Sequence, residues 1–162
     1  MAEQPGVIEL GTRLRLRAYD GERDVDAAWP WYRDLETVRL VDGEDARPYT
    51  RTQVRAMYEV LSAQGEVYMI EESDPSGTRE VIGDVTLAPH TLPIVVRAEA
   101  QGRGVGRLVI QSLIERARGL GWAELQVREI LPGNARSAAF FRGLGFEPTT
   151  SPPPALVLRL HA

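Results

Sequence analysis

The sequence has no cysteine and only two histidines, His90 and His161. These scarcities exclude a disulfide framework, a thiol nucleophile and a zinc site of the usual kind, and we expect no bound metal. No apolar run approaches the length that spans a membrane, and residues 1–11 lack a basic stretch followed by an apolar core. We therefore expect a cytoplasmic protein that does not bind a membrane.

An excess of positive charge is also missing, because 19 basic residues stand against 23 acidic ones and the net charge is −4. Nucleic-acid-binding domains normally have a basic face and a high pI, so no nucleic-acid partner is expected. Acidic residues are dense over Asp42–Asp45, and such a cluster attracts ammonium groups through its field. A solvated loop with no partner is the commoner interpretation of such a run, and it stays open.

The 162 residues suffice for one domain, residues 1–162, whose core needs neither a disulfide nor a metal. The apolar patterns predict, in order, a strand at 14–18, helices at 24–35 and 52–63, a hairpin of 66–71 with 80–87, a short strand at 94–96, a helix at 107–120, a strand at 124–130, a helix that starts at Asn134, and a strand at 155–160. This is an α/β (α+β) arrangement, with a mixed, mostly antiparallel sheet of roughly six to seven strands and about four helices.

What the sequence does contain is a glycine loop at residues 101–106, between the apolar strand at 94–96 and the helix at 107–120. Glycine at every second position lets successive backbone N–H groups converge, and the helix start adds unpaired donors and partial positive charge. The segment therefore predicts an anion site, and a pyrophosphate is the anion that fits it best.

Other phosphate motifs fit this loop poorly. A P-loop ends in Gly-Lys followed by Ser or Thr, whereas this loop ends in Gly106-Arg107-Leu108. A dinucleotide fingerprint needs Gly-x-Gly-x-x-Gly, and the alternation of Gly102, Gly104 and Gly106 does not match it. A glycine-rich turn without any ligand stays open as an alternative.

The pattern Gln-x-x-Gly-x-Gly at 101–106 resembles the acetyl-CoA pyrophosphate motif of the GNAT superfamily of N-acetyltransferases. A second segment, residues 134–146, resembles the Asn-x-x-Ser/Ala helix of that family, which ends in Gly-Phe. The resemblance covers about residues 94–146 and implies a sheet that splays between its fourth and fifth strands. It also implies that acetyl-CoA is the cosubstrate and that the acetyl group moves directly to a primary amine of a small molecule or peptide.

The same resemblance implies which residues hold the cofactor. The main chain of Ile94 and Val96 would contact the pantetheine and the thioester carbonyl, the loop N–H groups would bind the pyrophosphate, and Gln101 would fix the loop. Arg103 either adds charge there or is solvated, and Asn134 either bonds the cofactor arm or is an ordinary helix cap. The implied set is Ile94, Val96, Gln101, Gly102, Arg103, Gly104, Val105, Gly106, Asn134, Arg136, Ser137 and Phe141.

Phe141 departs from the family pattern, because many relatives carry at that position a tyrosine proposed to protonate the leaving sulfur. Phenylalanine has no proton to give, so either the thiolate leaves unaided or another donor acts. Unaided departure is physically acceptable for a thiol with a pKa of about 8.5. This departure also motivates the alternative function, a catalytically weak or inactive acyl-CoA-binding or regulatory module.

An ammonium with a pKa near 10.4 is neutral only about once in a few thousand molecules at pH 7, so a general base is useful. His90 falls where several family members place a catalytic Glu, and an imidazole suits proton acceptance at neutral pH. Glu71, Glu72 and Asp84 on neighbouring strands are rivals, acting directly or through water. A surface histidine without a role is the simplest interpretation of His90. The resemblance also implies that Ile94 contributes to catalysis through its main chain.

The acceptor itself is only loosely indicated. Trp29, Trp31, Tyr32 and the acidic run at 42–45 weakly resemble the acceptor side of aminoglycoside 6′-N-acetyltransferases and of enzymes that acetylate ribosomal-protein amino termini. Aromatic residues there are more often core than substrate wall. We expect a small-molecule or peptide amine, with a cationic one favoured by the net charge, and both a monomer and a homodimer stay open.

Overall fold

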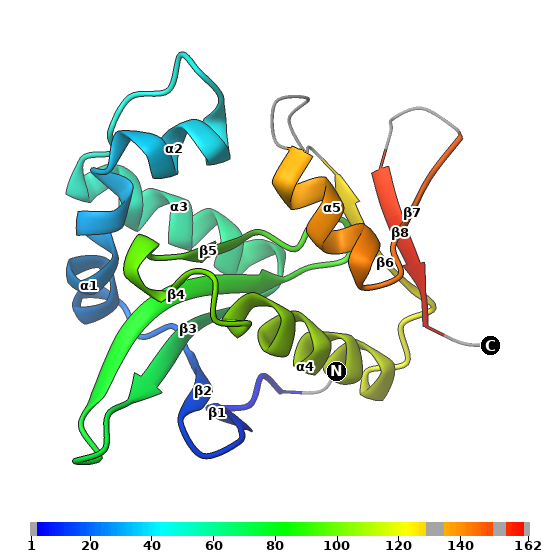
Figure 1. Cartoon of the computed structure of the whole chain (residues 1–162), viewed down its shortest axis with the longest axis horizontal. Coiled ribbons are helices and arrows are strands. Elements are labelled where there is room, and N and C mark those ends of the chain that lie inside the picture. Colours follow the sequence, from blue (N-terminus) through cyan, green and yellow to red (C-terminus); the bar gives the residue numbers. More distant parts are fainter. Residues whose placement is uncertain (1–2, 129–134, 151–154, 161–162) are drawn as a thin grey trace.

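Two antiparallel sheets form the frame of the molecule (Figure 1). The computed structural model describes residues 3–128, 135–150 and 155–160. The first sheet has the order β1 (Val7–Leu10), β2 (Leu14–Ala18), β3 (Glu66–Ser73), β4 (Arg79–Leu87) and β5 (Ile94–Val96). The second has the order β6 (Glu124–Arg128), β8 (Ala155–Arg159) and β7 (Glu147–Pro148). Within these residues no pairing joins β5 to β6, so the expected splay between the two strands is present.

The described residues hold eight strands, against the six to seven expected from the sequence. The additional strands are short: β1 has four residues and pairs with β2, and β7 has two residues and pairs with β8. Neither is long enough to show a convincing alternation by itself. The α/β class, the antiparallel pairing and the hairpin of β3 with β4 are as predicted.

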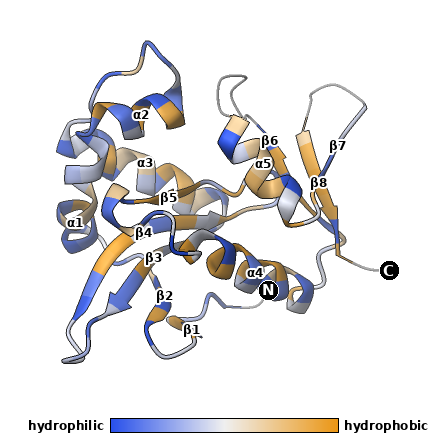
Figure 2. Ribbon diagram, in the orientation of Figure 1, coloured by the Kyte–Doolittle hydropathy of each residue, from blue (hydrophilic) through white to orange (hydrophobic). Residues whose placement is uncertain are grey.

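Helices cover both faces of the first sheet. They are α1 (Glu22–Tyr32), α2 (Leu35–Asp42), α3 (Arg51–Gln64), α4 (Val105–Gly119) and α5 (Ala135–Gly143), with a short 3₁₀ turn at Ala98–Ala100. Alternate residues of β3 point to different cores, Tyr68 and Ile70 to the one that contains α4, and Val67 and Met69 to the one that contains α1 and α3. The sheet is therefore buried between two helical layers. In Figure 2 the hydrophobic residues are concentrated on the strands in the middle of the molecule, while the end of the β3–β4 hairpin is hydrophilic.

The region before β3 differs from the prediction, which placed one helix at 24–35. The chain forms α1, breaks at Arg33 and Asp34, and then forms α2, which the sequence pattern did not reveal. Asp34 caps α2, because its carboxylate accepts a hydrogen bond of 3.1 Å from the Thr37 amide. Since α1 begins at Glu22, Pro30 lies near the end of the helix and not in its first turn. The helix expected after Thr50 is confirmed as α3, with a complete capping box.

No helix within the described ranges is both long and apolar enough to pass through a bilayer.

Candidate active site

A cleft of about 490 Å³ lies where the two sheets separate. Four parts of the chain line it: α2, the edge strand β5, the glycine loop with the start of α4, and α5. The lining residues are Thr37, Leu40, Val41, Ile94, Val95, Val96, Ala100, Gln101, Gly102, Gly104, Val105, Gly106, Arg107, Arg136, Ser137, Ala139, Phe140 and Gly143. Most of the residues predicted for the cofactor therefore come together in one cavity.

The glycine loop adopts a conformation that requires glycine. Gly102 and Gly104 have φ angles of 78° and 79°, and Gly104 is the N-cap of the 15-residue helix α4. A Cβ on Gly106 would lie 3.4 Å from the Phe140 ring, at the edge of normal contact. The three glycines thus allow the loop conformation and leave its backbone uncovered by side chains.

The amides of this loop are available to a ligand. Among the described residues, the N–H groups of 102–107 donate no hydrogen bond, and the first bond into α4 runs from the Leu108 amide to the Gly104 carbonyl at 3.2 Å. Free donors that converge at a helix start, where the macrodipole is positive, suit a diphosphate. The residues present therefore fit the pyrophosphate of acetyl-CoA.

Gln101 ties this loop to the neighbouring elements. Its Nε2 donates to the Val96 carbonyl at 2.8 Å, and its Oε1 accepts from Arg136 Nη1 of α5 at 3.3 Å. The side chain thus joins the end of β5, the loop and α5 at one point. Arg136 and Ser137 both lie on the cleft wall, whereas Asn134 lies outside the described residues.

Edge strand β5 presents its main chain to the cleft. The Thr86 amide donates to the Pro93 carbonyl at 3.0 Å and the Arg97 amide to the Ile82 carbonyl at 2.8 Å, with Val95 opposite Asp84 in the same register. Hydrogen-bonded pairs alternate along an antiparallel ladder, so the N–H and C=O of Ile94 and Val96 point away from β4 and into the gap. This is the orientation that a pantetheine arm would need in order to pair with the strand.

Glycine allows β5 to lie close to β4. A Cβ on Gly83 would lie 2.3 Å from the Val95 carbonyl oxygen, a distance that no side chain tolerates. Any substitution there would push β5 outward and narrow the cleft.

Arg103 and Glu72 form an ion pair. The two Arg103 nitrogens lie 3.1 and 3.2 Å from the two Glu72 carboxylate oxygens, and neither residue lines the cleft. Glu72 is also on β3, two strands away from the edge that faces the gap. His90 is exposed in the turn between β4 and β5, within the Ala88–Thr91 bridge, and it too lies outside the cleft lining.

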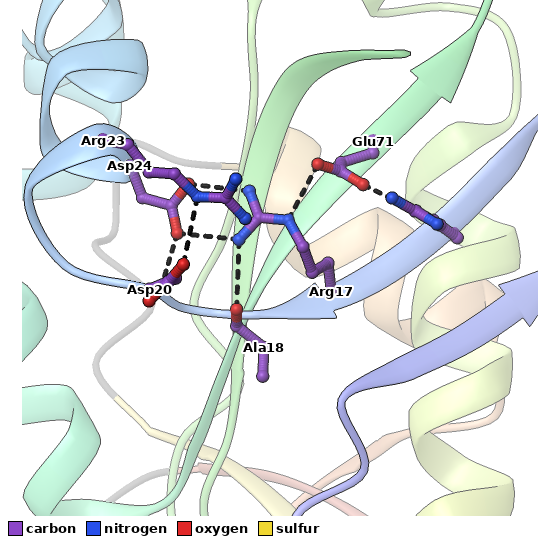
Figure 3. Close-up of polar contacts among 7 residues, drawn as sticks. Arg17, Ala18, Asp20, Arg23, Asp24 and Glu71 are labelled. Atoms are coloured by element: carbon purple, nitrogen blue, oxygen red, sulfur yellow. Dashed lines mark hydrogen bonds and ion pairs between the residues drawn. The ribbon is translucent and has the colours of Figure 1, made fainter. Parts of the chain in front are cut away.

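Glu71, another rival base, belongs to a cluster of ion pairs. Its two oxygens accept from Arg15 Nε at 2.6 Å and Arg17 Nε at 2.8 Å, and Arg17 also makes two hydrogen bonds to Asp24, at 2.7 and 3.0 Å. Figure 3 shows Arg17 lying between the two carboxylates. Burial raises the pKa of Glu71, but the bonds from Arg17 and Arg15 outweigh burial and hold that pKa below its ordinary value.

Asp84 is buried with an exposed fraction of 5%, on the face of β4 that α1 and α3 cover. Its Oδ2 accepts a hydrogen bond of 2.8 Å from the Tyr32 hydroxyl and one of 2.6 Å from the Tyr58 hydroxyl. Burial raises the pKa of Asp84 to about 6, and the two hydroxyl donors only partly oppose that rise. Burial likewise raises the pKa of both tyrosines well above the ordinary value, so both remain protonated donors.

The two adjacent phenylalanines of α5 face different ways. Phe141 is 2% exposed and packs edge-on against Phe140 and Phe146, with ring centroids 5.1 and 5.3 Å away. Phe140, and not Phe141, lines the cleft.

Helix α2 forms one wall of the cleft, which the sequence did not indicate, through Thr37, Leu40 and Val41. Its only local signal is the Asp34 cap followed by an apolar helical spacing.

Comparison with known proteins agrees with this geometry. The model of the acetyltransferase (GNAT) domain family matches residues 13–147. The chain is 31% identical over 86 residues to glucosamine 6-phosphate N-acetyltransferase 1 of Oryza sativa subsp. japonica, covering 46% of this chain and 52% of that protein. It is 44% identical over 54 residues to an L-methionine sulfoximine/L-methionine sulfone acetyltransferase of Pseudomonas aeruginosa, covering 33% and 31%.

Among solved structures, the fold resembles spermidine N-acetyltransferase from Vibrio cholerae in complex with CoA and spermine. The TM-score is 0.69 at 14% identity, over 91% of this chain and 95% of that one. The chain thus spans about half of the rice protein's length and about a third of the Pseudomonas protein's length. Since the family model covers most of the sequence, the chain belongs to the GNAT family of acetyltransferases.

Proposed function

We propose that this chain is an acetyl-CoA-dependent N-acetyltransferase that moves the acetyl group directly to a primary amine of a small molecule or peptide. The observation that carries the proposal is the joint placement of two backbone features. The free amides of 102–107 lie at the head of α4, and the outward main chain of β5 borders the same cleft. One feature suits a diphosphate and the other suits an extended arm that ends in a thioester.

Bound acetyl-CoA would supply an activated acetyl thioester. The chain's own contribution is to hold it by the loop amides, to align it along Ile94 and Val96, and to aim an outward N–H of β5 at the oxygen that gains charge. Losing one such donor typically costs a few kcal/mol of barrier. Because Phe141 has no proton to give and its ring is buried in the core, no acid at that position assists the leaving thiolate.

The acceptor class is an amine. The rice relative is named for glucosamine 6-phosphate and the Vibrio structure holds spermine, so both relatives concern amines of small molecules. The acidic net charge of this chain favours a cationic acceptor. Acceptor pockets vary within one fold, so the particular amine is a matter for a screen.

The proposal is tested by following thermal stabilisation and CoA release together. The chain has no cysteine and no lysine, so a thiol reagent reports only released CoA, and no lysine side chain consumes acetyl groups. We expect acetyl-CoA to raise the melting temperature, and amines from a panel of polyamines, aminoglycosides, amino sugars and amino acids to release CoA. Absence of stabilisation at high acetyl-CoA concentration would overturn the proposal. Stabilisation without release across the panel would favour a binding module instead.

A matched pair of variants connects this result to the loop. Gly104→Val places a β-branched residue at a φ of 79°, which distorts the loop, whereas Gly119→Ala changes a glycine of the same helix that has no neighbour in its way. We expect the Kd of acetyl-CoA to rise at least about tenfold in Gly104→Val, equivalent to one lost charge-assisted hydrogen bond, and to stay unchanged in Gly119→Ala.

A further inference from the structure

Helix α2 presents apolar side chains to the cleft. Leu40 and Val41 have exposed fractions of 47% and 39%, and both line the cleft together with Thr37 of the same helix. We call these three residues the α2 wall. Covering a leucine and a valine that face water with an apolar group is favourable, and clefts lined in this way are typical sites for apolar ligands. The α2 wall therefore suits the apolar part of a small molecule.

The α2 wall lies on the other face of the first sheet from the glycine loop, and Figure 1 shows the sheet between α2 and α4. Val38 of α2 and Val95 of β5 pack in the core that contains α1 and α3. Ile94 and Val96 of β5 pack with Val105 of α4 in the core on the opposite face. All of the β5 residues line the cleft, so the cleft reaches both faces of this edge strand. A diphosphate at the loop would leave the α2 wall for a second molecule.

The charged residues at the cleft do not suit a polycation. Among the described residues that line it, the charged ones are Arg107 of α4 and Arg136 of α5, and both are cations at the phosphate end. Asp42 at the end of α2 is not in that lining, and its carboxylate accepts a hydrogen bond of 2.6 Å from the Tyr49 hydroxyl. The acidic net charge attracts any ammonium at long range, whereas the groups at the cleft discriminate between the molecules that carry it.

We propose that the acceptor is a primary amine carried on an apolar chain, and that Leu40 and Val41 determine this specificity by covering the chain. The proposal rests on the proposed acetyltransferase function and narrows its acceptor from amines in general to apolar monoamines. The ammonium end would point toward β5, where the thioester would lie, and the apolar end would lie on the α2 wall. Polyamines and aminoglycosides, whose bodies are polar and charged, would be poor acceptors because they gain little by covering that wall.

A binding experiment tests the α2 wall without any acetyl donor. Protein labelled with 13C at the leucine and valine methyl groups, with CoA added, is titrated with n-hexylammonium chloride or, in a second sample, with spermidine. We expect hexylammonium to shift the methyl signals of Leu40 and Val41 saturably and to bind at least about tenfold more tightly than spermidine. Methyl signals that hexylammonium does not move, or equal or tighter binding of spermidine, would overturn the proposal.

Leu35 is the matched control within the same helix. It belongs to α2 and has an exposed fraction of 39%, yet it is not in the cleft lining. We expect its methyl signals to stay in place at hexylammonium concentrations that saturate Leu40. A Leu35 shift as large as that of Leu40 would mean unspecific adsorption to exposed apolar residues and would also overturn the proposal.

A series of amines measures the same wall by turnover. From n-propylamine to n-hexylamine we expect kcat/KM for the amine to rise about two- to fourfold with each methylene, because each one is removed from water on the wall. Leu40→Gln should flatten this dependence, whereas Leu35→Gln should keep it. The methyl signals of Val38, which is fully buried, show whether α2 stays folded in each variant. No rise along the series, or the same rise in Leu40→Gln, would contradict the proposal.

A charge on the wall should reverse the preference. Leu40→Asp places a carboxylate where a second ammonium could bind, so the ratio of kcat/KM for spermidine to that for n-hexylamine should rise at least about tenfold. Leu35→Asp should leave the ratio unchanged, and equal ratios in the two variants would contradict the role of Leu40. A chain that fails to bind acetyl-CoA would lose the proposed function, while the methyl titration would still report on the α2 wall. A wild-type chain that releases CoA more readily with spermidine than with n-hexylamine would keep the proposed function and overturn the specificity.

Discussion

Helix α1 is attached to the sheet at its two ends by clusters of opposite character. At its beginning, Asp24 pairs with Arg17, which also binds Glu71, so two buried carboxylates share guanidinium partners (Figure 3). At its end, Tyr32 reaches Asp84, which has only hydroxyl partners. The pKa of Glu71 lies below its ordinary value while that of Asp84 is raised to about 6.

The two clusters differ in whether the buried carboxylate has a cation to stabilise it. A compensated carboxylate holds elements together, and removing its partner leaves a buried charge unpaired. An uncompensated carboxylate weakens the fold at neutral pH, because its charged form is buried without a cation. The two ends of α1 should therefore respond to pH in opposite ways.

The largest expected effect comes from removing the shared cation. Arg17→Met leaves Asp24, only 1% exposed, without its bidentate partner, and deprives Glu71 of one of two. We expect the free energy of unfolding at pH 7.5, measured by urea denaturation, to fall by about 3–5 kcal/mol. A loss below about 1 kcal/mol would show that the cluster is not what holds the start of α1.

The second effect has the opposite sign. The Asp84 pKa is raised from 3.8 to about 6, so the folded state binds that proton more tightly than the unfolded state. Its stabilising contribution is complete below pH 3.8 and is lost as the pH rises through 6, a difference of up to about 3 kcal/mol. Asp84→Asn removes this dependence and can still accept both hydroxyls. It should therefore be more stable than the wild type at pH 7.5, by about 1–3 kcal/mol, and the gain should vanish near pH 4.

Glu71→Gln makes the contrast between the two clusters clearer. The difference in the free energy of unfolding between wild type and variant should change with pH in the opposite direction from that of Asp84→Asn. A lowered pKa gives stability that is present above the ordinary value of 4.5 and lost as the pH falls through the folded-state pKa. Urea denaturation of both variants from about pH 3 to pH 8 would show the two slopes, that of Glu71 below pH 4.5 and that of Asp84 between pH 3.8 and about 6. Slopes of the same sign would remove the distinction between the clusters.

A smaller effect is expected from the hydroxyls. Tyr58→Phe leaves Oδ2 with the Tyr32 donor alone, while the Tyr58 ring keeps its place beside Tyr19 at a centroid distance of 4.7 Å. The pKa of Asp84 should rise further, and stability at pH 7.5 should fall by about 1–2 kcal/mol, with less loss at pH 5 where the carboxyl is largely protonated. An NMR titration of the 13C-labelled Asp84 carboxyl would measure the rise in its pKa. Urea denaturation at pH 7.5 and at pH 5 would measure the loss of stability.

The smallest effect serves as the baseline. Arg23 pairs with Asp20 at 3.2 Å on the surface beside the Arg17 cluster, with side-chain exposures of 62% and 71%. Arg23→Met should change stability by less than about 0.5 kcal/mol, because exposed ion pairs contribute little. A loss of stability as large as that of Arg17→Met would mean that the number of charges near α1 determines stability, and not whether the ion pair is buried.

The glycine loop could be predicted because its signal is local. Gly102, Gly104 and Gly106 lie between an apolar strand and an amphipathic helix, and each of these patterns is legible within a few residues. The splay between the sheets followed from the resemblance to the GNAT superfamily. Local order was enough to place the loop at the head of α4.

The surroundings of Asp84 and the wall formed by α2 could not be predicted in the same way, because they depend on distant contacts. Tyr32 and Tyr58 are 52 and 26 residues from Asp84 in the sequence, and nothing in the strand pattern marks the Asp84 carboxyl as uncompensated. The rotation of α5 about its own axis places Phe140 toward the cleft and Phe141 toward the core, and the sequence does not reveal that rotation. Helix α2 is short and has one fully buried apolar residue, Val38, so its periodicity is weak.

The proposed function depends most on the backbone from 102 to 107, which we expect to bind the diphosphate of acetyl-CoA at the start of α4. An NMR titration of 15N-labelled protein with acetyl-CoA tests it residue by residue. We expect the amide signals of residues 102–107 to move most, and we expect Gly104→Val to abolish these shifts while Gly119→Ala preserves them. Saturable binding that leaves those amides unmoved would contradict it.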